Sequence, residues 1–158
     1  MYMAQALKEN GAGGRIDTLE IVDQHLAQSK HLWQQTEVID FVRAHRISSS
    51  VFETDETYDL LFLDSEPYHR FDELVRFYPA LRPGGYIVIH DLHDHLGLTG
   101  LVIEGMHHWP FGDFREKFGS LLKDSSLQTV TFPAPRGLVL FQKASADFAH
   151  TNFLRGGS

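Results

Sequence analysis

Apolar and polar positions follow one another along this chain in blocks that predict helices and strands in turn. Residues 2–10 and 25–36 have helix-forming composition, and Gly11 ends the first of these segments. Residues 15–23 and 38–42 are short runs rich in apolar and β-branched side chains, which are typical of strands. The first third of the chain therefore predicts helix, strand, helix and strand in that order.

The middle of the chain carries the clearest pattern. An uninterrupted apolar run, LLFL, lies within 58–67 and predicts a strand that is buried on both faces of a sheet. Residues 70–81 place apolar side chains at helical spacing, and an RPGG turn at 82–85 leads into a second apolar strand at 86–91. Because His90 continues this strand, we expect its side chain to point into the sheet packing.

The last part of the chain predicts one more helix and a hairpin. Residues 113–123 have helical composition, and two strand-like segments at 127–132 and 138–143 flank a PAPRG turn at 133–137. Strands alternating with helices and closed by a hairpin predict an α/β fold, a doubly wound and mostly parallel sheet with a C-terminal antiparallel hairpin. The 158 residues suit a single domain, 1–158.

Composition and charge narrow the class of protein. The chain has no cysteine, which excludes disulfides, thiolate metal sites and cysteine nucleophiles. A net charge of −7 without a basic stripe argues against a nucleic-acid partner. The sequence has neither an apolar run of membrane-spanning length nor a secretion signal, so we expect a cytoplasmic protein with no membrane partner.

Acidic side chains stand at or near the ends of three predicted strands, at Glu20, Asp64 and Asp91. Ligands of doubly wound folds bind where the carboxyl ends of parallel strands meet. We therefore expect Asp64 and Asp91 to converge at a ligand-binding edge. The alternative is that these acids only cap the helices or loops that follow.

The densest group of titratable side chains is HDLHDH at 90–95. His93 is the candidate general base, because a neutral imidazole accepts a proton well near pH 7. A solvated, histidine-rich loop is the alternative interpretation. The spacing H-E-x-x-H is absent, which excludes a metalloprotease of that kind.

Three features together resemble a known family. The apolar strand that ends in Asp64, the PGG turn before a strand ending in HD, and the terminal hairpin are similar to the small-molecule O-methyltransferase branch of the class I S-adenosylmethionine-dependent methyltransferases. The resemblance covers about 2–143 and implies a Rossmann-like fold that transfers a methyl group from S-adenosylmethionine to an oxygen of a small-molecule acceptor. It implies that Glu20, or else Asp23, holds the ribose hydroxyls of the cofactor, and that Asp64 also faces the cofactor.

The resemblance bears on a metal as well. In the metal-dependent branch of that family, acids at the positions of Asp64 and Asp91 hold a divalent cation such as Mg²⁺, which acidifies a bound hydroxyl. Here Leu92 follows the second acid, where that branch has Asn or another acid. His93 or a neighbouring side chain of its cluster would have to replace that ligand, which would favour a softer transition metal.

The family's first strand and its glycine-rich loop have no counterpart ahead of the helix at 2–10. The tail at 146–158, ADFAHTNFLRGGS, reads as strand and glycine loop when it is joined to the N-terminus. The sequence therefore predicts a circular permutation in which the tail supplies the first strand and brings cofactor-binding residues with it: Asn152, Arg155, Gly156, Gly157 and Ser158. The alternatives are a strand swapped between the subunits of a homodimer and a tail that forms no strand.

Two other functions stay open at this point. One is a non-catalytic binding or assembly module that keeps the fold with a degraded cofactor loop. The other is a metal-dependent enzyme of different chemistry that uses Asp64, Asp91 and His93. A metal requirement without cofactor binding would distinguish this second alternative.

Overall fold

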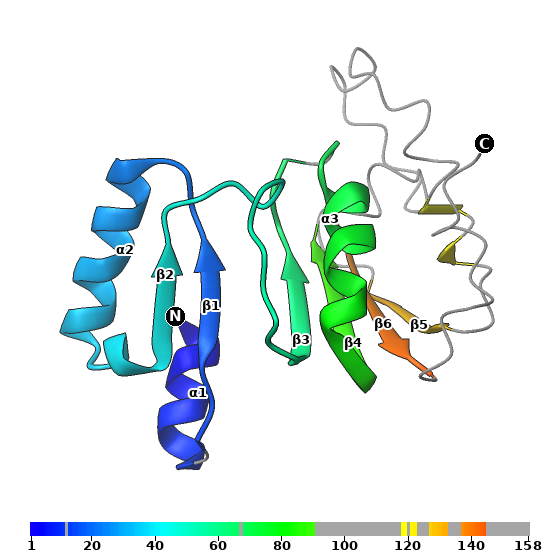
Figure 1. Cartoon of the computed structure of the whole chain (residues 1–158). Coiled ribbons are helices and arrows are strands. Elements are labelled where there is room, and N and C mark those ends of the chain that lie inside the picture. Colours follow the sequence, from blue (N-terminus) through cyan, green and yellow to red (C-terminus); the bar gives the residue numbers. More distant parts are fainter. Residues whose placement is uncertain are drawn as a thin grey trace. The chain divides into compact units, whose positions relative to one another are not determined.

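The structure, a computed structural model, describes residues 1–11, 13–66, 68–90, 118–119, 121–122, 127–132 and 137–144. The chain divides into two compact units, Met1–Glu53 and Thr54–Ser158 (Figure 1). The first unit contains α1 (Tyr2–Asn10), β1 (Ile16–Leu19), α2 (Asp23–Gln35), the 3₁₀ helix η1 (Ile39–Phe41) and β2 (Val42–His45). The second contains β3 (Tyr58–Leu63), α3 (Arg70–Phe77), the 3₁₀ helix η2 (Tyr78–Ala80), β4 (Leu81–His90), β5 (Leu127–Phe132) and β6 (Leu138–Lys143).

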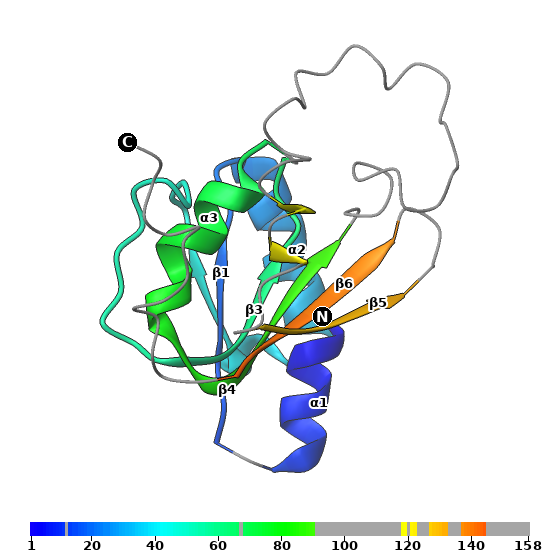
Figure 2. The same ribbon diagram turned by 90° about the vertical axis from the view of Figure 1, so that its right-hand side faces the viewer.

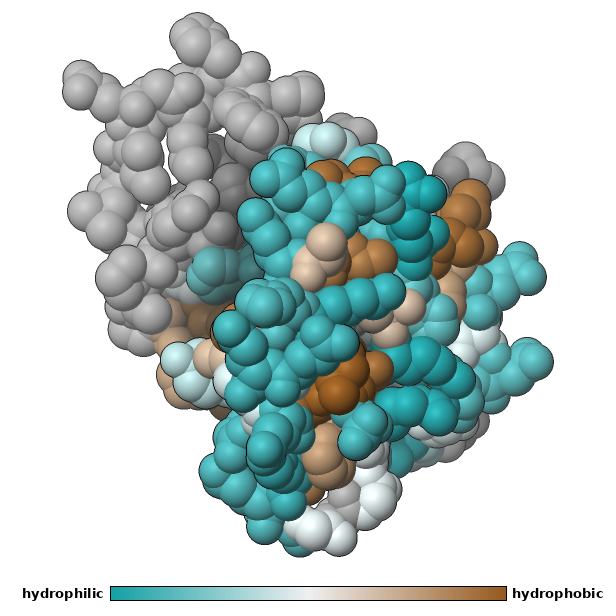
Figure 3. Space-filling view, turned by 90° about the vertical axis from the view of Figure 1, so that its left-hand side faces the viewer, coloured by the Kyte–Doolittle hydropathy of each residue, from teal (hydrophilic) through white to brown (hydrophobic). Residues whose placement is uncertain are grey.

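The first unit is a two-stranded parallel sheet with a small apolar core. β1 pairs with β2 from Ile16 opposite Val42 to Leu19 opposite His45. The core gathers side chains from both helices and from one face of the sheet, including Ala4, Trp33, Val38, Ile16, Val42 and Ala44. On the α2 side the surface is mainly hydrophilic with separate hydrophobic patches (Figure 3). These elements confirm the predicted order of helix, strand, helix and strand.

The predicted strand at 38–42 is displaced, because η1 occupies Ile39–Phe41 and the strand is Val42–His45. Val38 is fully buried and its N–H donates to the carbonyl of Trp33 at 2.9 Å, so this apolar run packs beneath the end of α2. A short apolar run does not distinguish a strand from a buried helix end. The strand itself contains the polar residues Arg43 and His45, so it lacks the apolar run from which a strand is predicted.

The second unit holds a four-stranded sheet in the order β3-β4-β6-β5, with α3 lying against it (Figure 2). β3 and β4 are parallel, and β6 runs antiparallel to both β4 and β5. The predicted parallel pair and the closing hairpin are therefore confirmed. The predicted turn at 82–85 lies within β4, where Gly84 has a positive φ of 76° and the pairing with β3 is irregular. Glycine adopts that backbone conformation at no steric cost.

The core of the second unit lies between α3 and one face of the sheet. Phe71 and Leu74 of α3 pack there with alternate strand residues, namely Leu61, Leu63, Ile87, Ile89, Val139 and Phe141. Phe118 meets Phe71 edge to face, with ring centroids 5.4 Å apart. The N–H of Leu122 donates to the carbonyl of Phe118 at 3.1 Å. This is a helical hydrogen bond, and it lies within the helix predicted over 113–123.

The opposite face of this sheet is exposed. Leu60 is 39% and Phe62 47% exposed, and the strand register puts Tyr86, Val130 and Phe132, also exposed, on the same face. The expectation that β3 is buried on both faces is therefore wrong in this unit. An apolar run shows that a strand suits burial, but the number of layers that cover it depends on elements elsewhere in the chain.

Several predicted site residues fall outside the described part of the chain: Asp91, His93, Asn152, Arg155, Gly156, Gly157 and Ser158. The tail at 146–158 that was expected to supply a strand lies outside it as well. Within the described residues, β1 pairs only with β2, and β3 pairs only with β4. Over that same part of the chain, no helix has both the length and the apolar character needed to cross a membrane.

Candidate functional site

A buried arginine joins the carboxyl ends of β3 and β4. Arg70, at the start of α3, is only 3% exposed. Its Nε donates to the carbonyl of Ser65 at 2.8 Å and its Nη1 to the carbonyl of His90 at 2.6 Å. Because the guanidinium is planar and its donors are rigidly placed, it fixes these two backbone segments relative to each other.

Asp64 and His90 meet at this same edge. Asp64 directly follows β3 and His90 is the last residue of β4. Nδ1 of His90 lies 2.9 Å from Oδ1 of Asp64, and Nη2 of Arg70 lies 3.7 Å from the same oxygen. The side chains of Asp64 and His90 are 47% and 38% exposed, so the pair is within reach of solvent and of a ligand.

The position of His90 corrects the expectation that its side chain points into the sheet packing. Successive side chains of a strand point to opposite faces. Ile87 and Ile89 occupy the buried face of β4, so His90 points to the other face and meets Asp64. Within the described residues, Asp64 is therefore held by a side chain of the neighbouring strand and by the first residue of α3.

The loop after β3 is tied to α3 a second time. Oγ of Ser65 donates to Oε2 of Glu73 at 2.6 Å. Glu73 is buried although it carries a carboxyl group. A buried carboxylate requires such hydrogen bonds, because leaving it unpaired is costly. The segment around Asp64 is thus held at Ser65 by both Arg70 and Glu73.

Glu20 directly follows the parallel strand β1 in the first unit. Its N–H donates to the carbonyl of His45 at 3.1 Å, directly after β1. Its Oε1 accepts the N–H of Val22 at 2.8 Å, and its Oε2 lies 3.5 Å from Nδ1 of His25. The carboxylate therefore supports the start of α2 and is fixed in orientation. Asp23, the second choice for the same role, is paired with Arg46, whose Nη2 donates to Oδ2 at 2.8 Å.

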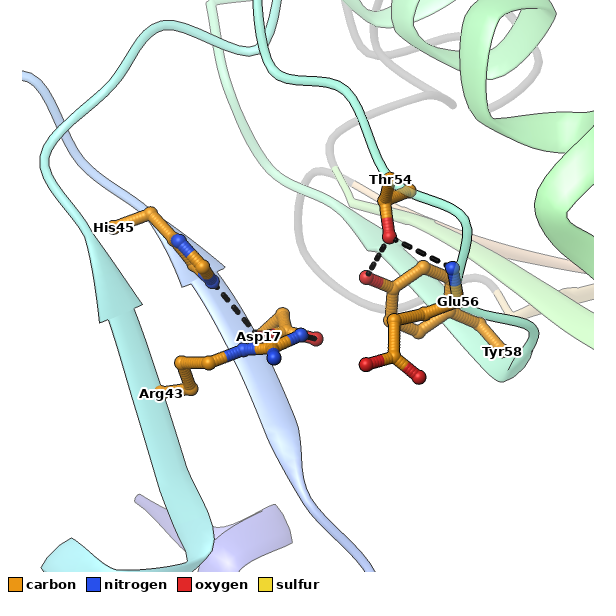
Figure 4. Close-up of polar contacts among 6 residues, drawn as sticks. All are labelled: Asp17, Arg43, His45, Thr54, Glu56 and Tyr58. Carbon is orange, nitrogen blue, oxygen red and sulfur yellow. Dashed lines mark hydrogen bonds and ion pairs between the residues drawn. The ribbon is translucent and has the colours of Figure 1, made fainter.

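A polar cluster on the two-stranded sheet was missed by the sequence analysis (Figure 4). Asp17, whose side chain is buried, accepts a hydrogen bond from Nη2 of Arg43 at 2.8 Å and contacts Arg43 Nε as well. Nε2 of His45 lies 2.9 Å from Oδ1 of the same carboxylate. The signal in the sequence was spacing: Asp17 and Leu19 are two residues apart, as are Arg43 and His45, and side chains two residues apart on a strand point to the same face. The pairing of β1 with β2 then brings all four side chains to one face of the sheet.

The second unit contributes the remaining contacts drawn in Figure 4. Oγ1 of Thr54 accepts the N–H of Glu56 at 3.1 Å and lies 3.2 Å from the hydroxyl of Tyr58. These bonds order the chain immediately before β3.

Of the predicted metal ligands, the structure describes Asp64 alone, since Asp91 and His93 lie outside the described residues. Over the described ranges, no three His, Asp or Glu side chains are grouped as a metal site requires. The carboxylate of Asp64 already contacts an imidazole and lies beside the Arg70 guanidinium. A positive charge at that distance opposes the binding of a second cation. These contacts already engage the Asp64 carboxylate, and the metal predicted for Asp64 and Asp91 stays a prediction.

The chain can now be placed among known proteins. A family model described as a methyltransferase domain matches residues 1–92, which is more than half of the chain. This chain belongs to the methyltransferase domain family. No curated protein matches it.

Solved structures place this methyltransferase domain in a common fold. The O-methyltransferase TomG from Streptomyces achromogenes, in complex with SAM, superposes with a TM-score of 0.71 at 16% identity, covering 91% of this chain and 67% of that one. The O-methyltransferase from Bacillus cereus, in complex with SAH, gives a TM-score of 0.66 at 17% identity, over 84% of this chain and 64% of that one. An SAH-bound methyltransferase from Podospora anserina gives 0.65 at 20% identity, over 83% and 61%.

These similarities confirm the predicted Rossmann-like methyltransferase fold. At 16% to 20% sequence identity, these similarities are evidence for the fold alone. The chain spans 61% to 67% of the length of these three structures, and 62% of a related structure from Corynebacterium glutamicum.

Proposed function

We propose that this methyltransferase domain transfers a methyl group from S-adenosylmethionine to an oxygen of a small-molecule acceptor. The observation that carries the proposal is the family match over residues 1–92. Two structures of the same fold, from Streptomyces achromogenes and Bacillus cereus, are O-methyltransferases in complex with SAM and SAH. Methyl transfer in line from a sulfonium needs a positioned acceptor and a group that takes its proton.

The residues at the end of β1 fit the ribose of this cofactor. A ribose diol offers two hydroxyl donors, and a carboxylate accepts both. Glu20 provides such a carboxylate, partly exposed and held in one orientation by the N–H of Val22. The proposed site also includes Asp64 and, beyond the described residues, Asp91, His93 and the tail residues named above.

Calorimetric titration of the full chain with SAH tests the proposal. We expect binding by the wild-type protein and an affinity at least about tenfold lower in Glu20→Gln. A hydrogen bond to a charged group contributes about 1.5–3 kcal/mol, and 1.4 kcal/mol is a factor of ten. Gln can still accept the N–H of Val22, so the start of α2 is retained.

The matched control is Glu9→Gln, which removes one negative charge from an exposed position on α1. It should bind SAH as the wild type does. A folded full-length chain that does not bind SAH would overturn the proposed function and favour the non-catalytic module. Equal affinity of wild type and Glu20→Gln would instead remove Glu20 from the site.

A further inference from the structure

We propose that Asp17 and His45 are positioning residues of the cofactor site, because together they fix Glu20 at the end of β1, where it would meet the ribose hydroxyls of S-adenosylmethionine. The inference rests on the proposed function and extends it to two side chains that act through Glu20. It starts from a series of contacts that leads from the buried carboxylate of Asp17 through His45 to the backbone of Glu20.

The first contact joins two side chains on one face of the sheet. Nε2 of His45 lies 2.9 Å from Oδ1 of Asp17 (Figure 4). A carboxylate accepts hydrogen bonds and does not donate them, so Nε2 is the donor. The imidazole also meets the ring of Phe52, with ring centroids 4.8 Å apart. The side chain at the end of β2 is therefore held by two partners.

The second contact passes from His45 to Glu20 through the backbone. The carbonyl of His45 accepts the N–H of Glu20 at 3.1 Å, one step beyond the last pair of the ladder, Leu19 opposite His45. Oε1 of Glu20 accepts the N–H of Val22 at 2.8 Å. Because this bond ties the carboxylate to its own chain, the position of the carboxylate follows that of the backbone, which the end of β2 fixes.

Asp17 also specifies the register of β1 against β2. It stands opposite Arg43, whose Nη2 donates to Oδ2 at 2.8 Å, in a ladder of four residue pairs. A shift by one residue would turn every side chain of β1 to the other face of the sheet. The carboxylate would then leave Arg43 and His45 for the apolar core, at a high cost. The same shift would put a residue other than Glu20 at the end of the strand.

Stability alone does not explain the burial of Asp17, whose side chain is 7% exposed. The desolvation of buried charges can exceed their attraction, so apolar residues of similar volume often stabilise a core as well or better. The best attested use of buried polar and ionic groups is to fix register. This pair stands next to the strand end that Glu20 follows, where register decides which side chain meets a ligand.

The experiment measures SAH affinity by calorimetric titration of the full chain in matched variants. His45→Gln places an amide donor near the position of Nε2, whereas His45→Leu has a side chain of similar size without a donor. The two variants differ chiefly in the bond to Asp17. Asp17→Asn removes the charge on the other side of this contact. His31→Leu and Asp40→Asn are the controls, because His31 on α2 and Asp40 on η1 are exposed.

We expect SAH affinity to fall at least about fivefold in His45→Leu and in Asp17→Asn, which is within the range of coupling inside one hydrogen-bond network. It should fall less than about twofold in His45→Gln and in both controls. In a chain that already has Glu20→Gln, His45→Leu should lower the affinity by less than about a further twofold, because the carboxylate that it positions is gone. Circular dichroism and urea unfolding establish that each variant is folded.

Wild-type affinity in folded His45→Leu and Asp17→Asn would overturn the inference, and so would an equal loss in His45→Gln. A loss of the same size in the Glu20→Gln chain would show that His45 does not act through Glu20. If only one of the two variants folds, it decides, and failure of both to fold would overturn the inference in favour of a structural role. Unchanged affinity in Glu20→Gln alone would also overturn it and leave the proposed function standing. Failure of the wild type to bind SAH is a different result, because it removes the proposed function itself.

Discussion

At the scale of single residues, the structure explains how a lysine lies in the core of the second unit. Lys143 is the last residue of β6 and is almost completely buried. Its Nζ donates to the carbonyl of Leu81 at 2.6 Å and to that of Tyr78 at 3.3 Å, and it lies 4.5 Å from the centre of the Tyr78 ring. Burial disfavours the charged form and lowers the pKa of Lys143 below 10.5.

This lowered pKa predicts how stability depends on pH. Between the pKa of the folded protein and the ordinary value of 10.5, the unfolded chain binds more protons than the folded one. The free energy of unfolding should therefore rise with pH across that interval. In Lys143→Met this rise should be missing. The free energy of unfolding of the variant, relative to that of the wild type, should therefore fall as the pH approaches 10.5.

Urea unfolding followed by circular dichroism at neutral and alkaline pH measures the effect. Lys30→Met is the control, because Lys30 is exposed on α2 and its replacement should leave the wild-type pH dependence unchanged. Parallel curves for wild type and Lys143→Met would contradict the prediction.

At the scale of elements, β3 shows that an apolar strand can have two unequal faces. Leu61 is 8% exposed and packs in the core under α3, whereas its neighbour Leu60 is 39% exposed. The two side chains are chemically the same and differ only in the face to which the strand directs them. Their contributions to stability should therefore differ.

We predict that Leu61→Ala lowers the free energy of unfolding by about 2–4 kcal/mol, because it leaves a cavity in the core. Leu60→Ala should cost about 1 kcal/mol or less, since the site is already open to solvent. Urea unfolding of the two variants measures both values. Large and equal losses would show that both faces of β3 are covered in solution.

At the scale of the whole molecule, the two sheets raise the question of a further strand. β1 and β3 each pair with one neighbour within the described residues, although the family match and the fold place them in the same methyltransferase domain. We propose that the tail at 146–158 supplies a strand to such an edge, either in the same chain or in a homodimer by exchange. The single strand partner that β1 and β3 each have among the described residues supports this proposal.

Deletion of 146–158 should abolish SAH binding in a chain that circular dichroism shows to be folded. A variant with the same tail residues in scrambled order is the matched control, because it keeps length and charge, and it should also fail to bind. Light scattering then separates the two routes. A dimer that becomes a monomer on deletion supports exchange, and a monomer throughout supports pairing within one chain. Undiminished SAH binding by the deleted chain would contradict the proposal.

Local pattern was sufficient for much of the fold. The helix at 2–10 and the hairpin strands at 127–132 and 138–143 agree with α1, β5 and β6. The spacing of apolar residues and a glycine at the end of a helix reflect the backbone preferences of residues that are neighbours in the sequence. Such elements can therefore be predicted from the sequence directly. The resemblance to the methyltransferase family rested on such segments and was confirmed by the match over 1–92.

What the sequence by itself determined, then, is the α/β class, the order of its elements and the family. Only the tertiary structure decided which side chains meet. His90 and Asp64 are 26 positions apart, as are Arg43 and Asp17, and both contacts depend on strand register. The exposed face of β3 likewise depends on which helices cover the sheet. Such relations join residues that are distant along the chain, and a local pattern contains no information about them.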